Sequence, residues 1–392
     1  MKAEISGLET NQTWTIVDLP LGKTLIRCKW VFKVKYKSTG EVERSVVALA
    51  ATSGWYIFQI DAHNVFLQGD LLEEVYMHIP DSFSIQGELQ QQQQQKVCKL
   101  HKSLYGLKQA PRQWNLKLIS ALTDMGFVQS HYDYSLFTHK VGCDLVVVLV
   151  YVDDLLVTGT SLALIQQVRK DLQARFKMKD LGELKFFLGI EFLRSKEGIL
   201  MNQRKYALEL VSEMGLAGSR TAVTPLEFNH KLSSVELDKF LHTNETLVDK
   251  ELEDRSSYQR LIGRPLYLTM TRPDIAFVVQ VLSQYMHAHK DSHMDAAMRV
   301  VRYIKGIAGL GLFMLADGST ELSAFCDSDW GACVETRKSV TGYMVKFGQA
   351  LVSWKSKKQS TVSRSSAEAE FRSMASTVAE ITWLIGLFKE LD

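Results

Sequence analysis

The stretch that decides the fold is residues 145–159, in which the apolar runs LVVVLV (145–150) and LLVTG (155–159) flank the tetrapeptide Tyr151-Val152-Asp153-Asp154. Two short β-branched runs joined by a few polar residues predict a buried β-hairpin. We expect this hairpin to present Asp153 and Asp154 at its tip. Paired aspartates are also common turn formers, so a functional interpretation needs support from elsewhere in the chain.

A third carboxylate gives that support. Asp61 directly follows the apolar run WYIFQI (55–60), which predicts another strand. An aspartate at the end of one strand, facing a hairpin that carries two more, can place three carboxylates around a hard cation. Magnesium takes oxygen ligands and usually combines one or two carboxylates with substrate phosphates. The pattern therefore predicts a site for two Mg²⁺ ions that serves nucleotidyl transfer, with Asp61, Asp153 and Asp154 as catalytic metal ligands.

Three ordered motifs carry a specific family resemblance. They are YVDD (151–154), DAHNVFL (61–67) and SLYGLKQAPRQW (103–114). Together they closely resemble the reverse transcriptase of copia-type long-terminal-repeat retrotransposons. The resemblance implies an RNA-directed DNA polymerase that extends a primer on an RNA or DNA template from deoxynucleoside triphosphates (dNTPs). It also implies an α+β fold: a right-hand polymerase with fingers, palm and thumb, followed by a partial ribonuclease H-like α/β domain.

The same resemblance implies roles for residues near the substrate. Phe66 matches the bulky side chain beneath the nucleotide sugar, although it also fits an ordinary core phenylalanine. Tyr105, Gly106 and Pro111 match the segment that packs under the templating base and the nucleotide. A glycine there lets the backbone approach a substrate, but an ordinary turn would need it as well.

The resemblance divides the chain into three regions. Residues 1–175 correspond to shortened fingers and the palm, residues 176–318 to a helical thumb and connection, and residues 319–392 to a truncated ribonuclease H-like domain. In the last region Asp327 is expected to end a strand and Glu368 to lie one turn into a long helix over residues 365–391. The family's domain uses four carboxylates, so these two represent half of a site and ribonuclease H activity is not expected.

A departure from the family pattern lies near Arg44. The family carries a block of roughly forty residues after this position, and the block supplies cations for the incoming triphosphate. In this chain Arg44 runs directly into the apolar residues 46–51. We therefore expect polymerase activity to be impaired. The alternatives are a non-catalytic nucleic-acid-binding relic and an inert, decayed copy.

The composition favours a soluble intracellular protein. Hydrophobic residues make up 46% of the chain, no apolar run is long enough to span a bilayer, and the five cysteines show no paired spacing. No membrane association is expected, and a cytoplasmic particle or the nucleus would both fit. His287, His289 and His293 are not expected to bind a metal, because no thiol or acidic second shell accompanies them.

Positive charge is concentrated in three stretches that contain no acid, although the net charge is only +2. Each stretch alone would suit a solvated face, whereas three of them beside aromatic residues resemble a phosphate track. The residues that we expect to bind nucleic acid are Lys108, Arg112, Lys355, Lys357 and Lys358. Pro265 is an oddity, because it falls where the family continues a helix and would cost that helix about 3 kcal/mol.

Overall fold

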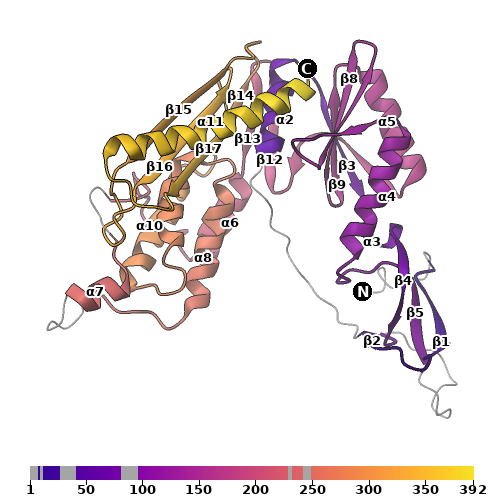
Figure 1. Cartoon of the computed structure of the whole chain (residues 1–392), viewed down its shortest axis with the longest axis horizontal. Coiled ribbons are helices and arrows are strands. Elements are labelled where there is room, and N and C mark those ends of the chain that lie inside the picture. The colour runs from indigo at the N-terminus through magenta and orange to yellow at the C-terminus, as the bar shows by residue number, and fades with distance from the viewer. Residues whose placement is uncertain (1–7, 9–11, 27–40, 81–95, 228–231, 242–248) are drawn as a thin grey trace. The chain divides into compact units, whose positions relative to one another are not determined.

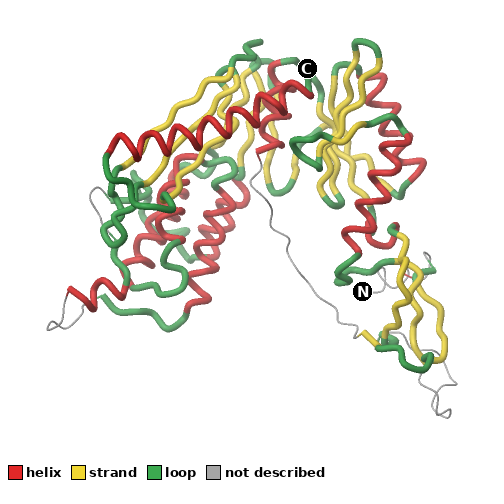
Figure 2. Tube along the Cα trace, viewed as in Figure 1, coloured by secondary structure: helices red, strands yellow, loops and turns green. Residues whose placement is uncertain are grey.

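The computed structural model describes residues 8, 12–26, 41–80, 96–227, 232–241 and 249–392. Two compact units account for the chain. The first contains residues 1–35 and 58–183, and the second contains residues 36–57 and 184–392 (Figures 1 and 2). Both combine helices with sheets, as the α+β prediction required. Within the described residues, no helix is both long enough and apolar enough to cross a membrane.

A small four-stranded sheet belongs to the first unit. Its order is β1-β5-β4-β2, and the strands are β1 (Trp14–Asp18), β5 (Lys96–Lys102), β4 (Asp70–Met77) and β2 (Leu25–Ile26). Met77, Cys98 and Leu100 form its buried core. The loose alternation of basic and apolar residues over 26–37 predicts a further strand, but this stretch lies almost entirely outside the described residues.

The larger sheet of this unit has six strands in the order β10-β3-β9-β8-β7-β6. They are β10 (Met178–Glu183), β3 (Ile57–Ala62), β9 (Asp154–Gly159), β8 (Asp144–Tyr151), β7 (Leu136–Val141) and β6 (Val128–Gln129). The central strands β8 and β9 are buried on both faces, which explains why their sequences are continuous apolar runs. The predicted hairpin is confirmed.

Three helices complete the first unit: α3 (Val65–Gln68), α4 (Ala110–Asp124) and α5 (Leu162–Arg175). Side chains from all three join the core of the six-stranded sheet, which explains the apolar stripes of α4 and α5. Figure 1 shows α4 and α5 running beside the strands. Helix α4 stops just before Gly126, which has a left-handed φ of 87°.

The second unit contains a four-stranded sheet in the order β11-β12-β13-β14 and a set of packed helices. The strands are β11 (Phe186–Phe187), β12 (Ile190–Arg194), β13 (Gly198–Asn202) and β14 (Gly311–Leu315). The helices are α6 (Arg204–Glu213), α7 (Val235–Leu241), α8 (Arg255–Leu268), the 3₁₀ turn η1 (Pro273–Ile275), α9 (Ala276–Ser283) and α10 (Asp291–Gly306). Apolar faces of α6, α8, α9 and α10 share one core.

Two details of this unit differ from the expectations. The polar composition of residues 222–254 indicates an irregular linker, but the stretch contains the short helix α7. Helix α8 continues through Pro265 to Leu268 without a break. Pro265 is itself buried, so packing of α8 against its neighbours offsets the hydrogen bond that proline cannot donate.

Helix α2 (Glu41–Thr52) contains Arg44, the position after which the family resemblance predicts a further block, and it belongs to the second unit. Its residues Val46, Val47 and Ala48 are no more than 1% exposed. Arg44 is also buried: its Nε donates to the carbonyl oxygen of Val352 at 2.8 Å, and its guanidinium stacks over Trp354. Residues 41–52 therefore form a helix that is packed into the second unit.

The C-terminal part of the second unit is a three-stranded antiparallel sheet covered by one long helix. The strands β15 (Leu322–Asp329), β16 (Val340–Phe347) and β17 (Ala350–Lys358) lie in that order, and α11 (Ser366–Glu390) packs over them. Strand β15 extends beyond the predicted segment, so Asp327 lies within the strand and does not end it. Every residue from Leu322 to Asp329 pairs with a residue of β16, and this pairing holds the additional residues in the sheet.

Candidate active site

The tip of the β8–β9 hairpin is a two-residue turn made of Val152 and Asp153. We expected Asp154 in the turn. It pairs with Tyr151 instead, so it is the first residue of β9. Val152 has a φ of 51°, a left-handed conformation that is unfavourable for a β-branched residue. Such strain persists only where the surroundings enforce it, and it is concentrated at functional sites.

Asp61 lies at the end of β3, the strand next to β9 in the sheet. The backbone N–H of Ala62 donates to the carbonyl oxygen of Asp153 at 2.7 Å. This bond joins the residue after Asp61 to the hairpin turn. The structure therefore brings the two predicted strand ends together, although they are far apart in the sequence.

Gln59 ties the third aspartate to the same region. Its side-chain amide donates to Asp154 Oδ1 at 3.1 Å, and its side chain is only 7% exposed. Because alternate residues of a strand share a face, Gln59 and Asp61 lie on the same side of β3. The contact thus places the Asp154 carboxylate on the face that carries Asp61.

Trp114 supports the turn from helix α4. Its indole Nε1 donates to the carbonyl oxygen of Val152 at 2.6 Å, and its ring packs edge-on against Phe176. The sequence motifs include Trp114 without giving it a role, and they do not include Gln59. The two-residue offset between Gln59 and Asp61 was a signal that could have identified Gln59.

The donor set suits a hard cation. All three aspartates are among the described residues, where no group of three or more His, Cys, Asp or Glu side chains is arranged to hold a metal ion. Asp61 and Asp153 nevertheless lie on bonded neighbouring segments. Since magnesium usually takes only one or two carboxylates and completes its shell with water and substrate phosphates, these residues fit that ion.

The predicted substrate-binding residues lie near one another. Phe66 is 5% exposed and belongs to the core, as expected of an ordinary core phenylalanine. Its ring also contacts Tyr105 edge-on, with 4.4 Å between the ring centroids. Tyr105 is 55% exposed. Gly106 has a φ of 95°, and a side chain there would meet no described atom within 4 Å. Pro111 opens α4 at its first turn.

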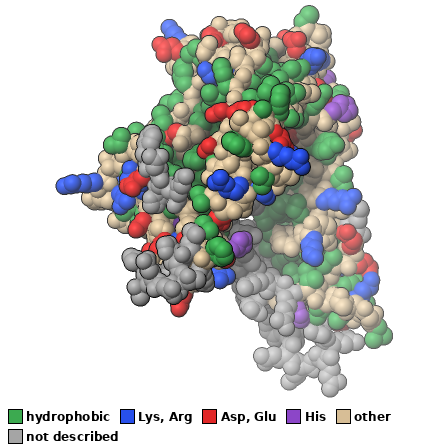
Figure 3. All heavy atoms as spheres, turned by 60° about the vertical axis from the view of Figure 1, so that its left-hand side comes forward, with side chains coloured by type: hydrophobic (Ala, Val, Ile, Leu, Met, Phe, Trp, Pro, Cys, Tyr) green, Lys and Arg blue, Asp and Glu red, His purple; other side chains and the backbone are tan. Residues whose placement is uncertain are grey.

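The basic stretches are only partly available to a polyanion. Lys96 pairs with Asp18, whereas Lys23 and Lys99 both pair with Glu74. Each of these lysines therefore pairs with an acid that is distant in the sequence, which the order of charges along the chain could not show. On the face shown in Figure 3, Lys and Arg side chains are interspersed with Asp and Glu.

The residues predicted to contact nucleic acid differ from those paired lysines. Lys108, Arg112, Lys355 and Lys357 are exposed, and Lys358 is half-buried with its Nζ 3.6 Å from Cys333 Sγ. None of these five forms an ion pair with a described residue.

The two C-terminal carboxylates are not brought together by any contact among the described residues. Ser328 faces α11, because its hydroxyl contacts Gln359, which in turn donates to the carbonyl oxygen of Ala369. Strand alternation then directs the exposed Asp327 side chain to the opposite face of β15.

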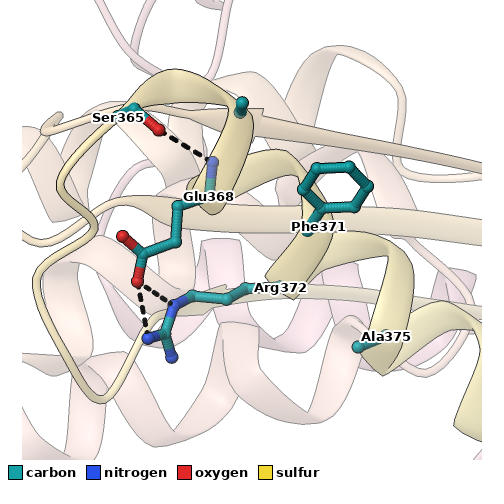
Figure 4. A pocket seen from close by; sticks show the side chains of 6 residues that line it. Ser365, Glu368, Phe371, Arg372 and Ala375 are labelled. Atoms are coloured by element: carbon teal, nitrogen blue, oxygen red, sulfur yellow. Dashed lines mark hydrogen bonds and ion pairs between the residues drawn. The ribbon is translucent and has the colours of Figure 1, made fainter.

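Glu368 lies instead at an open hollow of about 500 Å³ at the start of α11 (Figure 4). It accepts the backbone N–H of Arg364 at 2.8 Å and pairs with Arg372 at 2.8 Å. The Arg364 N–H and the Arg372 guanidinium hold the pKa of Glu368 below its usual value.

His293 has structural partners, whereas His289 stacks on the ring of Tyr258. His293 Nδ1 accepts the backbone N–H of Lys290 at 3.1 Å, and Nε2 lies 3.0 Å from the carbonyl oxygen of Ser233. Burial lowers the pKa of His293 to about 4. Lys290 forms ion pairs with Asp238 and Asp249. This cluster connects the start of α10 to the preceding polar segment and leaves neither His293 nitrogen for a metal.

Comparison with known proteins identifies relatives of the chain. Residues 39–228 match the family described as reverse transcriptase (RNA-dependent DNA polymerase). The whole chain is 35% and 36% identical to retrovirus-related Pol polyproteins from the transposons RE2 and RE1 of Arabidopsis thaliana, covering 28% of each. It is 32% identical to the Pol polyprotein from transposon TNT 1-94 of Nicotiana tabacum, covering 31% of that protein.

The alignments differ in length both from the relatives and from the chain itself. The chain spans less than a third of the length of those three relatives. The alignments with RE1 and RE2 run over 424 residues, whereas the chain has 392, so they contain gaps in this chain. The relatives therefore carry segments that this chain lacks.

Proposed function

Because the chain belongs to the reverse-transcriptase family of copia-type retrotransposon Pol polyproteins, we propose that its first unit is the catalytic part of an RNA-directed DNA polymerase. The observation that carries the proposal is the bond between Ala62 N–H and the Asp153 carbonyl oxygen. It joins the strand end that bears Asp61 to the Asp153–Asp154 hairpin.

In this mechanism, Asp61, Asp153 and Asp154 would hold two magnesium ions. Gln59 orients the Asp154 carboxylate, and Trp114 fixes the strained turn that carries Asp153. When bound, magnesium supplies positive charge that activates the primer 3′-hydroxyl and stabilises the leaving pyrophosphate. Rigid support from the buried strands matters because the reacting oxygens must stay in line.

We assign Phe66, Tyr105, Gly106 and Pro111 to the nucleotide and template side of the site. The edge-on contact between Phe66 and Tyr105 supports this assignment, since it couples a buried ring to an exposed one. A base or sugar could pack on the exposed Tyr105 while Phe66 fixes its position. Gly106 leaves the backbone open beside it.

The chain as written should polymerise poorly. Positioning and charge neutralisation supply most of the catalysis in phosphoryl transfer, so loss of the triphosphate-binding cations should cost orders of magnitude in rate. The gaps in the alignments support a missing block. Arg44, the cation at the junction, cannot replace it, because its guanidinium is buried against Val352 and Trp354.

Primer extension tests the proposal. Two proteins would be compared on a homopolymer template with magnesium: the chain as written, and a chain with the corresponding block of an RE1-type relative inserted at Arg44. We expect extension by the second protein to be at least about a thousandfold faster. Equal rates would contradict the role of the missing block, and no extension by either protein would contradict the polymerase assignment.

A second candidate function is nucleic-acid binding without catalysis. It is favoured by the exposed Lys355 and Lys357 on β17, which form no ion pair with a described residue. If about five phosphates are engaged, the log–log slope of affinity against salt should be roughly −4. Changing Lys355, Lys357 and Lys358 together to Ala should flatten that slope, and an unchanged slope would show that these lysines are only a solvated face.

A further inference from the structure

The outer side of α11 carries an apolar stripe that the sheet does not use. It consists of Phe371, Met374, Val378, Ile381 and Ile385. Four of these side chains are well exposed, at 67% for Phe371, 47% for Met374, 59% for Val378 and 40% for Ile385, and Ile381 is half-buried. Large exposed side chains in such a regular array mark an interaction surface more often than scattered ones do.

A different face of α11 holds the helix in place. Ala369, Ser373, Thr377, Leu384 and Leu387 are buried there, and Ser373 Oγ donates to the carbonyl oxygen of Asp327 at 2.8 Å. The helix is therefore anchored on its sheet without the stripe. Burial of the stripe would add stability that the described fold does not already contain.

The spacing of the stripe indicates what kind of surface could cover it. Successive members are alternately three and four residues apart, which is the a/d repeat of a helix that packs along another helix. An extended peptide would not select this repeat, because its side chains alternate every second residue. A second helix with a matching apolar seam fits it.

We propose that the stripe is the interface between two copies of this chain, whose α11 helices pack antiparallel about a two-fold axis at Val378. Val378 lies midway between Phe371 and Ile385, so the two-fold axis matches each half of the stripe with the other half. The antiparallel arrangement also opposes the two helix dipoles.

Charge complementarity supports this occupant and orientation. Glu368 lies at the N-terminal end of the stripe, and Lys389 lies at the C-terminal end. Antiparallel pairing brings Lys389 of one copy beside Glu368 of the other, twice per dimer. A parallel pairing would instead place like charges together, which costs affinity.

The hollow at the start of α11 fits the same arrangement. It is lined by Ser365, Ala367, Glu368, Phe371, Arg372 and Ala375 (Figure 4). Phe371 forms one wall, and the ion pair between Glu368 and Arg372 forms another, so the hollow offers an apolar side and a charged side. In the antiparallel pair, the opposite copy directs Ile385 and the aliphatic stem of Lys389 towards it.

The first experiment measures the mass of the purified full chain by light scattering across a concentration series. We expect the mass to rise from 44.4 kDa towards twice that value. Val378→Glu should weaken the dimer by on the order of a hundredfold or more, because it opposes two like charges at the axis. Ser376→Glu is the matched control: Ser376 is exposed on the same helix outside the stripe, so the dimer should persist.

The second experiment tests the antiparallel orientation. Glu368→Lys and Lys389→Glu should each weaken the dimer by about fivefold, because each breaks the two symmetric pairs. The chain that carries both changes should recover most of the original affinity. Circular dichroism of every variant should match the unchanged chain.

Three results would overturn the proposal. They are a wild-type chain that remains monomeric at about 100 µM, equal effects of Val378→Glu and Ser376→Glu, and a double charge swap that is weaker than either single change. Neither experiment requires polymerase activity, so its outcome is independent of the proposed function.

Discussion

The two regions that carry carboxylate motifs differ in how the fold treats them. In the first unit, a backbone hydrogen bond joins Ala62, the residue after Asp61 on β3, to Asp153 in the hairpin turn, and the Gln59 amide contacts Asp154 from the same strand. In the second unit, Asp327 faces away from α11, whereas Glu368 pairs with Arg372. Adjacent elements thus join the segments of the first motif, whereas no contact among the described residues joins Asp327 to Glu368.

The largest expected effect separates these two regions by catalysis. In the chain with the restored block, Asp153→Asn should lower kcat/KM for primer extension by about a thousandfold or more, because it removes a carboxylate that positions the reacting groups. Asp327→Asn in the same protein should leave the rate unchanged. Similar losses for both variants, measured by primer extension, would contradict the distinction between the two regions.

A smaller effect concerns the support of the catalytic turn. Trp114→Phe leaves the carbonyl oxygen of Val152 without its indole donor, so we expect about 2 kcal/mol of destabilisation and about a tenfold loss of extension rate. Trp330→Phe is the matched change: Trp330 is 53% exposed and donates to the carbonyl oxygen of Ser363, so its effect should be within about 0.5 kcal/mol. Urea unfolding gives both free energies, and equal values would show that the turn needs no such support.

The state of Glu368 can be read from its titration. The Arg364 N–H and Arg372 favour the charged form, so NMR of the carboxyl group should give a pKa below the usual 4.5. Because the folded-state pKa is lowered, its contribution to stability is present above the unfolded pKa and is lost as the pH falls through the folded value. Arg372→Ala should move the pKa upward. An unchanged pKa would mean that the ion pair is not formed in solution.

The smallest expected effect is an absence of cleavage. Because Asp327 and Glu368 are not joined in one site, RNA in an RNA–DNA hybrid should remain intact in the presence of magnesium or manganese. Asp327→Asn should change nothing. Metal-dependent cleavage that disappears in Asp327→Asn would show that the two carboxylates act together after all, and it would remove the contrast between the regions.

Local patterns in the sequence predicted most elements around these sites. The hairpin of β8 and β9 followed from its apolar runs, and the long helix α11 was also expected. The predictions were less accurate at element ends: Asp154 begins a strand, and β15 continues past Asp327. Strand ends depend on pairing with a neighbour, which local composition does not contain.

The sequence by itself determined the family, the three aspartates and the regular stripe of α11, because each depends on residue identity and spacing along the chain. Only the tertiary structure decided that Lys96 and Lys99 pair with acids on other strands, that Arg44 is buried, and that the strand end beside Asp61 is bonded to the turn that carries Asp153. These outcomes depend on the order of strands in a sheet and on the face that each side chain occupies. Contacts between residues distant in sequence set both properties, and they form only when the chain folds.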